Sequence, residues 1–219
     1  MIKDNLQKVR GRIAAVCLRV GRRPDSVTIV CVSKGRGIEQ IKEAIEAGIT
    51  DIGENKVQEA LLKCKALSAI QIKWHMVGHL QTNKVKDAVK IFDLIHSVDS
   101  VHLAQEINKE AAKINKVQDI LIEVKASPEA TKSGLKPDEV TQVIKDIAEY
   151  KNINIKGLMT IAALVDNPQK ARPYFKELRE LRGMLNNPQL QLSMGMTDDF
   201  EVAIEEGADI VRLGRAVFE

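Results

Sequence analysis

Apolar residues along the chain follow two alternating spacings, one typical of helices and one typical of strands. At the N-terminus they recur every three or four positions, as on one helix face, at Ile2, Leu6, Val9, Ile13, Val16 and Val20. A continuous β-branched run at 27–33 follows and has the length of a buried strand. Further short apolar runs predict strands at 50–53, 72–77, 93–97, 119–125, 153–159, 190–193 and 209–213. Helical spacing between the runs predicts helices at 38–47, 55–68, 81–90, 100–115, 137–149, 169–185 and 197–206.

This alternation predicts an α/β protein built around a parallel sheet. Alternating strands and helices form parallel sheets whose faces the helices cover, and several of the runs are apolar throughout, as strands buried on both faces are. Eight such units are the number found in a closed (β/α)8 TIM barrel. An open, doubly wound sheet is the alternative, although such sheets usually have fewer strands. We therefore expect a single TIM-barrel domain over residues 1–219, with an extra N-terminal helix.

Composition and charge exclude several classes of protein. Hydrophobic residues make up 44% and charged residues 29% of the chain, as in an ordinary globular domain. A net charge of +3 does not indicate a nucleic-acid or membrane partner. The three cysteines show neither a metal-ligand spacing nor a disulfide framework. The N-terminus has no apolar signal segment and no stretch of 18 apolar residues occurs, so we expect a cytoplasmic protein.

The carboxyl end of the first predicted strand carries the most reactive candidate. Catalytic and binding groups of a barrel gather at the carboxyl ends of its strands, and Lys34 follows the run at 27–33. We expect its amine to point into the barrel mouth, where apolar walls lower the pKa of the ammonium group. A neutral amine there forms a Schiff base with an aldehyde. The alternative is a lysine that extends into solvent.

The last two strand ends resemble a phosphate cradle. Loops after the seventh and eighth strands of barrels often bind phosphate through backbone amides. Ser193 and Gly195 end the seventh strand, Gly214 ends the eighth, and the Ser193 hydroxyl can act as a further donor. No metal site is expected, because His75 and His79 lie about 13 Å apart on an extended strand.

Several motifs together resemble one known family, the pyridoxal 5′-phosphate (PLP) homeostasis proteins, also called the YggS/PROSC family. The resemblance runs nearly end to end and rests on VSK (32–34), GENKVQEA (53–60), WHMVGHLQTNKVK (74–86), IHSVDS (95–100), TKSGL (131–135), GLMTIA (157–162), LSMGMTDDFEVAI (192–204) and VRLGRAVF (211–218). The VSK and VRxG elements are shared with the barrel domain of alanine racemases.

The resemblance implies a barrel of the alanine racemase N-terminal domain type that binds PLP. Lys34 would hold the cofactor as an internal aldimine, and Ser193, Gly214 and the amide of Arg215 would hold its phosphate. Arg212 would face the pyridine nitrogen. The remaining residues around the cofactor would be Asn55, His79 and Met194. The family buffers PLP and delivers it to PLP-dependent apoenzymes without an established catalytic reaction, and we expect a monomer.

The sequence departs from the family pattern at two places, and two other functions are also consistent with it. Arg215 stands where relatives more often have Thr or Ser, and GRGIEQ follows Lys34 where many relatives carry Thr and Pro. Lys132 is a second candidate acceptor for the cofactor. One alternative function is a PLP-dependent amino-acid racemase-like enzyme. The other is a sugar-phosphate barrel enzyme whose Lys34 forms a Schiff base with its substrate.

Overall fold

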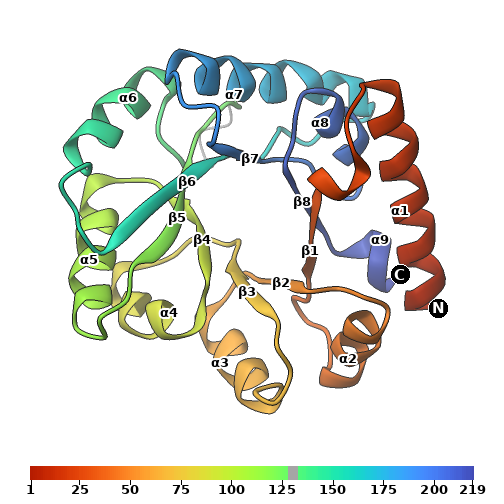
Figure 1. Ribbon diagram of the computed structural model, residues 1–219, viewed down its shortest axis with the longest axis horizontal. Helices are drawn as coiled ribbons and strands as arrows, with labels where there is room; N and C mark the ends of the chain where they lie inside the picture. The colour runs from red at the N-terminus through yellow and green to blue at the C-terminus, as the bar shows by residue number, and fades with distance from the viewer. Residues whose placement is uncertain (128–132) are drawn as a thin grey trace.

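The strands form a closed parallel barrel. The computed structural model describes residues 1–127 and 133–219, and within them eight strands follow one another around the barrel in chain order (Figure 1). Their bounds are β1 Thr28–Val32, β2 Asp51–Glu54, β3 Lys73–Met76, β4 Leu94–Val98, β5 Gln118–Glu123, β6 Ile153–Met159, β7 Gln191–Ser193 and β8 Ile210–Leu213. Val30 of β1 pairs with Asp51 of β2 on one side and with Arg212 of β8 on the other. This pairing of first and last strand confirms the barrel and excludes an open sheet.

Helices connect the strands on the outside of the barrel (Figure 1). Their bounds are α1 Ile2–Arg19, α2 Ile38–Glu46, α3 Val57–Ala66, α4 Val85–Ile91, α5 Val101–Ala112, α6 Pro137–Asp146, α7 Arg172–Met184, α8 Phe200–Glu205 and α9 Arg215–Phe218. Short 3-10 turns precede three of the elements, η1 Pro24–Ser26, η2 Thr82–Lys84 and η3 Pro168–Ala171. All the predicted helices are present, while η1 and the C-terminal α9 were not predicted.

The extra N-terminal helix covers the seam where the barrel closes. Helix α1 buries Ile2, Leu6 and Val9 among other residues of the predicted face, and it packs against α2, α8 and α9. The two chain termini therefore lie close together beside α1 and α9 (Figure 1). The helix ends before Gly21, whose φ of +66° lies in the left-handed region that glycine adopts readily. No helix in the described part of the chain is long and apolar enough to cross a membrane.

The inside of the barrel is partly apolar and partly polar. A small apolar cluster from five strands fills part of it, namely Val30, Leu94, Leu121, Met159 and Ile210. Other interior positions hold buried polar side chains from β2, β3, β4, β7 and β8, namely Asp51, His75, His96, Ser193 and Arg212. Buried polar groups are stable only when they are hydrogen-bonded, so these side chains must bond to one another across the barrel.

Candidate functional site

The barrel brings all of the predicted site residues to the carboxyl ends of its strands. Lys34 lies two residues beyond β1, Asn55 directly follows β2, and His79 lies in the loop after β3. The remaining five lie at the ends of β7 and β8 or just beyond them, namely Ser193, Met194, Arg212, Gly214 and Arg215. Because β1 and β8 are hydrogen-bonded neighbours, the loops that carry the first and the last of these residues are adjacent.

Lys34 is exposed to solvent at this end of the barrel. The prediction of apolar walls around its amine is therefore wrong, and so is the desolvation argument that depended on it. The backbone before it is fixed by a buried cluster. Lys63 Nζ on α3 donates to Glu54 Oε1 at 2.6 Å and to the Ser33 carbonyl at 2.7 Å, and the Ser33 hydroxyl also donates to Glu54. An exposed amine thus extends from a strand end that buried hydrogen bonds hold in place.

Arg212 lies just inside the barrel mouth and is almost completely buried. Its Nη1 donates to Ser193 Oγ at 2.7 Å, and its Nη2 donates to the Thr160 carbonyl at 2.8 Å. Burial lowers the pKa of Arg212 to about 10, against the attraction of Glu123 and Asp199. The guanidinium group therefore stays charged at neutral pH and is held in one orientation.

The Ser193 hydroxyl faces the barrel interior and not the loops. Besides accepting the bond from Arg212, Ser193 Oγ lies 2.9 Å from His96 Nδ1, and the residue is fully buried. Its hydroxyl is thus engaged inside the core, which corrects the prediction that it donates to a phosphate group. The alternation of side chains along a strand decides which way such a residue points.

The hydroxyl that faces the predicted cradle belongs to Thr197, which sequence reasoning missed. The backbone N–H of Ala216, in the first turn of α9, donates to Thr197 Oγ1 at 3.3 Å. Gly195 takes a φ of +90°, and a Cβ there would lie 2.5 Å from the Ala203 Cβ, so this turn requires glycine. A cavity of about 660 Å³ adjoins the loop and includes Thr197 in its lining. The TDD sequence after the glycine turn was the available signal.

Arg215 and Met194 do not contribute side chains to this cradle. The Arg215 guanidinium forms an ion pair with Asp198, and both side chains are exposed. Met194 is completely buried. Gly214 lies close to β1, since a Cβ at this position would come within 3.4 Å of the Val32 carbonyl oxygen. The loop after β8 therefore lies directly beside the strand that carries Lys34.

A small cavity of about 220 Å³ lies in the mouth between the loops after β3, β5 and β6. Its lining includes His79 and Glu123. Burial and repulsion from Asp99 raise the pKa of Glu123 to about 7, while the charge of Arg212 opposes the shift. Within the described chain Glu123 Oε2 has no hydrogen-bond partner. This buried carboxyl group was not predicted, and it titrates near neutral pH.

The loops after β2 and β3 support Asn55 and His79. Gly78 packs so tightly on Asn55 that a Cβ would lie 2.4 Å from the Asn55 carbonyl oxygen. His79 is exposed, with Nδ1 3.5 Å from Asp99 Oδ2. His75 instead bonds to Asp51 and His96 inside the barrel, so the two histidines of this motif have separate partners. The structure does not describe Lys132, which lies outside the described residues.

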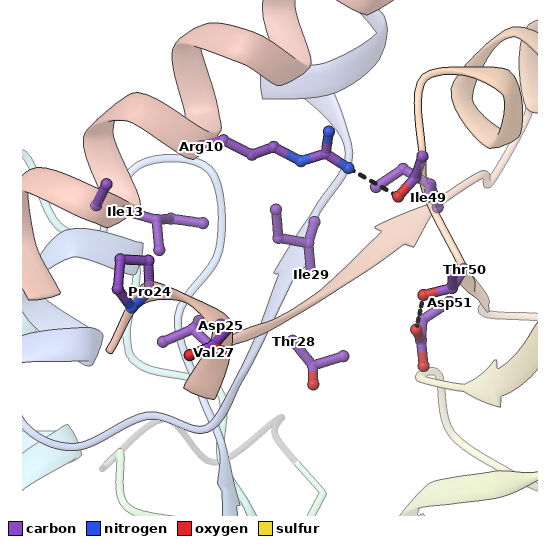
Figure 2. A pocket seen from close by; sticks show the side chains of 12 residues that line it. Arg10, Ile13, Pro24, Asp25, Val27, Thr28, Ile29, Ile49, Thr50 and Asp51 are labelled. Atoms are coloured by element: carbon purple, nitrogen blue, oxygen red, sulfur yellow. Dashed lines mark hydrogen bonds between the residues drawn. The ribbon is translucent and has the colours of Figure 1, made fainter. Parts of the chain in front are cut away.

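A further cavity, of about 630 Å³, lies at the opposite end of the barrel, between α1 and the starts of β1 and β2 (Figure 2). Arg10 donates to the carbonyls of Ala47 and Gly48 at its edge, and Thr50 bonds to Asp51. The lining contains none of the predicted site residues. The predicted site residues therefore lie at the other end of the barrel, where its strands have their carboxyl ends.

Comparison with known proteins agrees with the barrel fold. Residues 4–219 match the alanine racemase N-terminal domain family, which defines the class of barrel. The pyridoxal phosphate homeostasis protein of Aquifex aeolicus is 45% identical, over 98% of this chain and 96% of that protein. The protein of the same name from Pseudomonas aeruginosa is 36% identical, over 99% of this chain and 94% of that protein. The chain belongs to the family of pyridoxal phosphate homeostasis proteins, which confirms the predicted resemblance.

The solved structure of a related protein has the same fold. PipY of Synechococcus elongatus PCC7942, in a structure with PLP bound, is 33% identical to this chain with a TM-score of 0.88. The match covers 100% of both chains.

Proposed function

We propose that this chain binds PLP at the carboxyl ends of its barrel strands and acts in PLP homeostasis by holding and delivering the cofactor. The observation that carries the proposal is the contact between the loop after β8 and the end of β1, where Gly214 packs beside Val32. This contact supports the proposal because the loop after β8, which follows Arg212, lies beside the end of β1, which precedes Lys34. PLP has the matching aldehyde, pyridine nitrogen and phosphate.

Each part of the cofactor has a partner of suitable chemistry. Bound PLP would supply an aldehyde, and the Lys34 amine would be the group that holds it. Arg212 donates a hydrogen bond toward the pyridine nitrogen. The Thr197 hydroxyl and the backbone amide of Arg215 would bind the phosphate dianion through charge-assisted hydrogen bonds. Asn55, His79 and Met194 support the surrounding loops.

The exposure of Lys34 supports delivery rather than catalysis. A solvent-exposed attachment point is accessible to an amine from outside, such as a lysine of a recipient apoenzyme, which can take the cofactor by exchange. Arg212 remains protonated and does not transfer its proton to the ring, so the ring withdraws electrons weakly. We assign the chain to the cytoplasm as a monomer, with residues 1–219 as one PLP-binding domain. Its three free cysteines suit a reducing compartment.

The absorbance spectrum of the purified protein tests the proposal. Addition of PLP should give an absorbance band that borohydride abolishes, with the label on the peptide that contains Lys34. Lys34→Ala should lose both signals, whereas the exposed Lys56→Ala should keep them. A label on Lys132 would move the attachment point to the loop after β5. A colourless protein that PLP does not label would leave the sugar-phosphate alternative.

A further inference from the structure

The barrel interior contains a continuous series of hydrogen bonds from β8 to β2. Arg212 Nη1 lies 2.7 Å from Ser193 Oγ, and Ser193 Oγ lies 2.9 Å from His96 Nδ1. His96 Nε2 lies 2.9 Å from His75 Nδ1, and His75 Nε2 lies 2.9 Å from Asp51 Oδ1. All five residues are at least nine-tenths buried. Four consecutive bonds thus join the carboxyl end of the barrel to Asp51, the first residue of β2.

The chemistry of the two end groups fixes the direction of the first and the last bond. Burial raises the pKa of Asp51, but hydrogen bonds from His75 and Thr50 outweigh it and lower the pKa below its ordinary value. Asp51 is therefore a carboxylate that only accepts, and His75 Nε2 must carry hydrogen. At the other end Arg212 only donates. Ser193 Oγ accepts that bond, and its hydroxyl hydrogen needs an acceptor.

Neutral histidines satisfy every donor and acceptor in the series. Burial, together with the charge of Arg212, lowers the pKa of His96 well below its usual value, so the ring is neutral. With hydrogen on Nε2 of both rings, Ser193 donates to His96 and His96 donates to His75. A charged His75 would reverse these two bonds. Ser193 would then receive two donors, and its own hydrogen would have no acceptor in the series.

We propose that His75 and His96 form a one-way hydrogen-bond relay that positions Arg212 for the cofactor, with Asp51 holding the relay in its direction from the opposite end of the barrel. The proposal rests on the proposed PLP site. A serine hydroxyl alone rotates freely, but one that must donate to His96 presents a lone pair to Arg212. The guanidinium plane is then fixed by Ser193 and by the Thr160 carbonyl.

Asp51 lies at the opposite end of the barrel from the proposed PLP site, so it can affect Arg212 only through the relay. It lines the cavity at the amino end of the barrel, where Thr50 Oγ1 bonds to its second carboxylate oxygen at 2.6 Å (Figure 2). Chains of aligned hydrogen bonds polarise one another, so the negative charge of Asp51 strengthens each acceptor in the series, up to the Ser193 oxygen that accepts from Arg212. Asp51, His75, His96 and Ser193 are thus positioning residues.

Nitrogen NMR on the protein without PLP tests the relay independently of the proposed function. The chain has four histidines, and His79→Gln with His102→Gln leaves only the two rings of the relay. At pH 7 we expect both rings to be neutral with hydrogen on Nε2. Hydrogen on Nδ1 of either ring, or a charged ring, would overturn the proposal whatever PLP does.

Cofactor affinity then tests the positioning role. Asp51→Asn should weaken PLP and pyridoxal by the same factor, about tenfold, because the phosphate is not involved; tenfold corresponds to about 1.4 kcal/mol. Leu94→Ala, in the apolar interior cluster, is the matched control: it should lower Tm and leave the affinity within twofold. An Asp51→Asn protein that binds PLP as wild type does would contradict the relay.

If Asp51→Asn does not fold, His96→Asn tests whether the relay positions Arg212. Its amide oxygen can replace Nδ1 as the acceptor for Ser193, but the side chain is too short to reach His75. The relay predicts that affinity for PLP falls as in Asp51→Asn. Wild-type affinity in His96→Asn would show that the contact with Ser193 is sufficient and that Asp51 has no part. If wild-type protein binds no PLP, the proposed function fails while the NMR result still judges the relay.

Discussion

Lys63 on α3 donates a hydrogen bond to the backbone carbonyl of Ser33, the residue directly before Lys34. The same amine forms an ion pair with Glu54, whose side chain is completely buried. Residues from a helix and two strands thus fix the point from which the reactive amine extends. The interaction lies outside the barrel interior, between the strands and α3.

Removing Lys63 should therefore affect both stability and cofactor binding. Lys63→Met leaves the Glu54 carboxylate buried without its partner, and breaking a buried pair in this way costs about 3–5 kcal/mol. The free energy of unfolding in urea should fall by that amount at pH 7, and PLP should bind more weakly. Lys63→Met with Glu54→Gln should recover most of the stability, because no unpaired charge is left. A single variant as stable as wild type would show that the pair contributes little.

The barrel could be predicted from the sequence because the order of strands and helices depends on local spacing. Runs such as 27–33 and 209–213 carry the period of buried strands, and eight repeats leave few topologies. The order of strands and helices was also enough to place the candidate residues at the ends of strands. The direction of each side chain was harder: Ser193 was correctly placed at the end of β7, but its hydroxyl faces inward.

The contacts that were not predicted join residues far apart in sequence. Ser193 and His96 meet across the barrel although they are 97 positions apart in the sequence. Lys63 occupies a helix position that resembles a solvent-facing one, yet it is buried. Thr197 becomes a candidate only because the folded chain brings the backbone N–H of Ala216 to its hydroxyl oxygen. No local pattern contains this information, because closure of the barrel creates these contacts.

Thr197 and Ser193 should have different effects on cofactor selectivity. Wild-type protein should bind PLP at least about a hundredfold more tightly than pyridoxal, since hydrogen bonds to a charged group contribute roughly 1.5–3 kcal/mol each. Thr197→Val removes one such bond, so PLP should bind about tenfold to a hundredfold more weakly while pyridoxal is unchanged. Ser193→Ala should weaken both ligands alike. Isothermal titration with the two ligands measures this, and an equal loss in Thr197→Val would remove its hydroxyl from the cradle.

Glu123 should make stability fall as pH rises. Its pKa is raised to about 7 in the folded protein, while an unfolded Glu titrates near about 4.3. The folded state therefore binds more protons between these values, and the free energy of unfolding decreases across this window. Glu123→Gln removes the dependence and should be more stable than wild type at pH 8, by about 4 kcal/mol at most, but not at pH 4. Unfolding in urea at both pH values tests this, with the exposed Glu149→Gln as control. Parallel pH profiles for wild type and Glu123→Gln would contradict it.

The last prediction concerns the racemase alternative, and we expect no substantial racemase activity. Two-base racemisation needs a proton acceptor on each side of the substrate α-carbon, and Lys34 can serve one side only. Tyr150 follows α6 and Tyr174 lies within α7, so neither tyrosine of the chain lies at a strand end. Glu123 is the best remaining acceptor, because it is buried in the mouth and titrates near neutral pH.

Arg212 adds an electronic reason to this shortage of a second proton acceptor. With a pKa of about 10 it keeps its proton at neutral pH, so bound PLP stabilises negative charge at the α-carbon weakly. The measurement is exchange of the α-proton of several L-amino acids in D₂O by the PLP-loaded protein, with Lys34→Ala and Glu123→Gln beside it. We expect exchange slower than the typical enzyme range of about 1–10³ s⁻¹. Exchange within that range, abolished by both variants, would establish Lys34 and Glu123 as the two bases and favour the enzyme over the carrier.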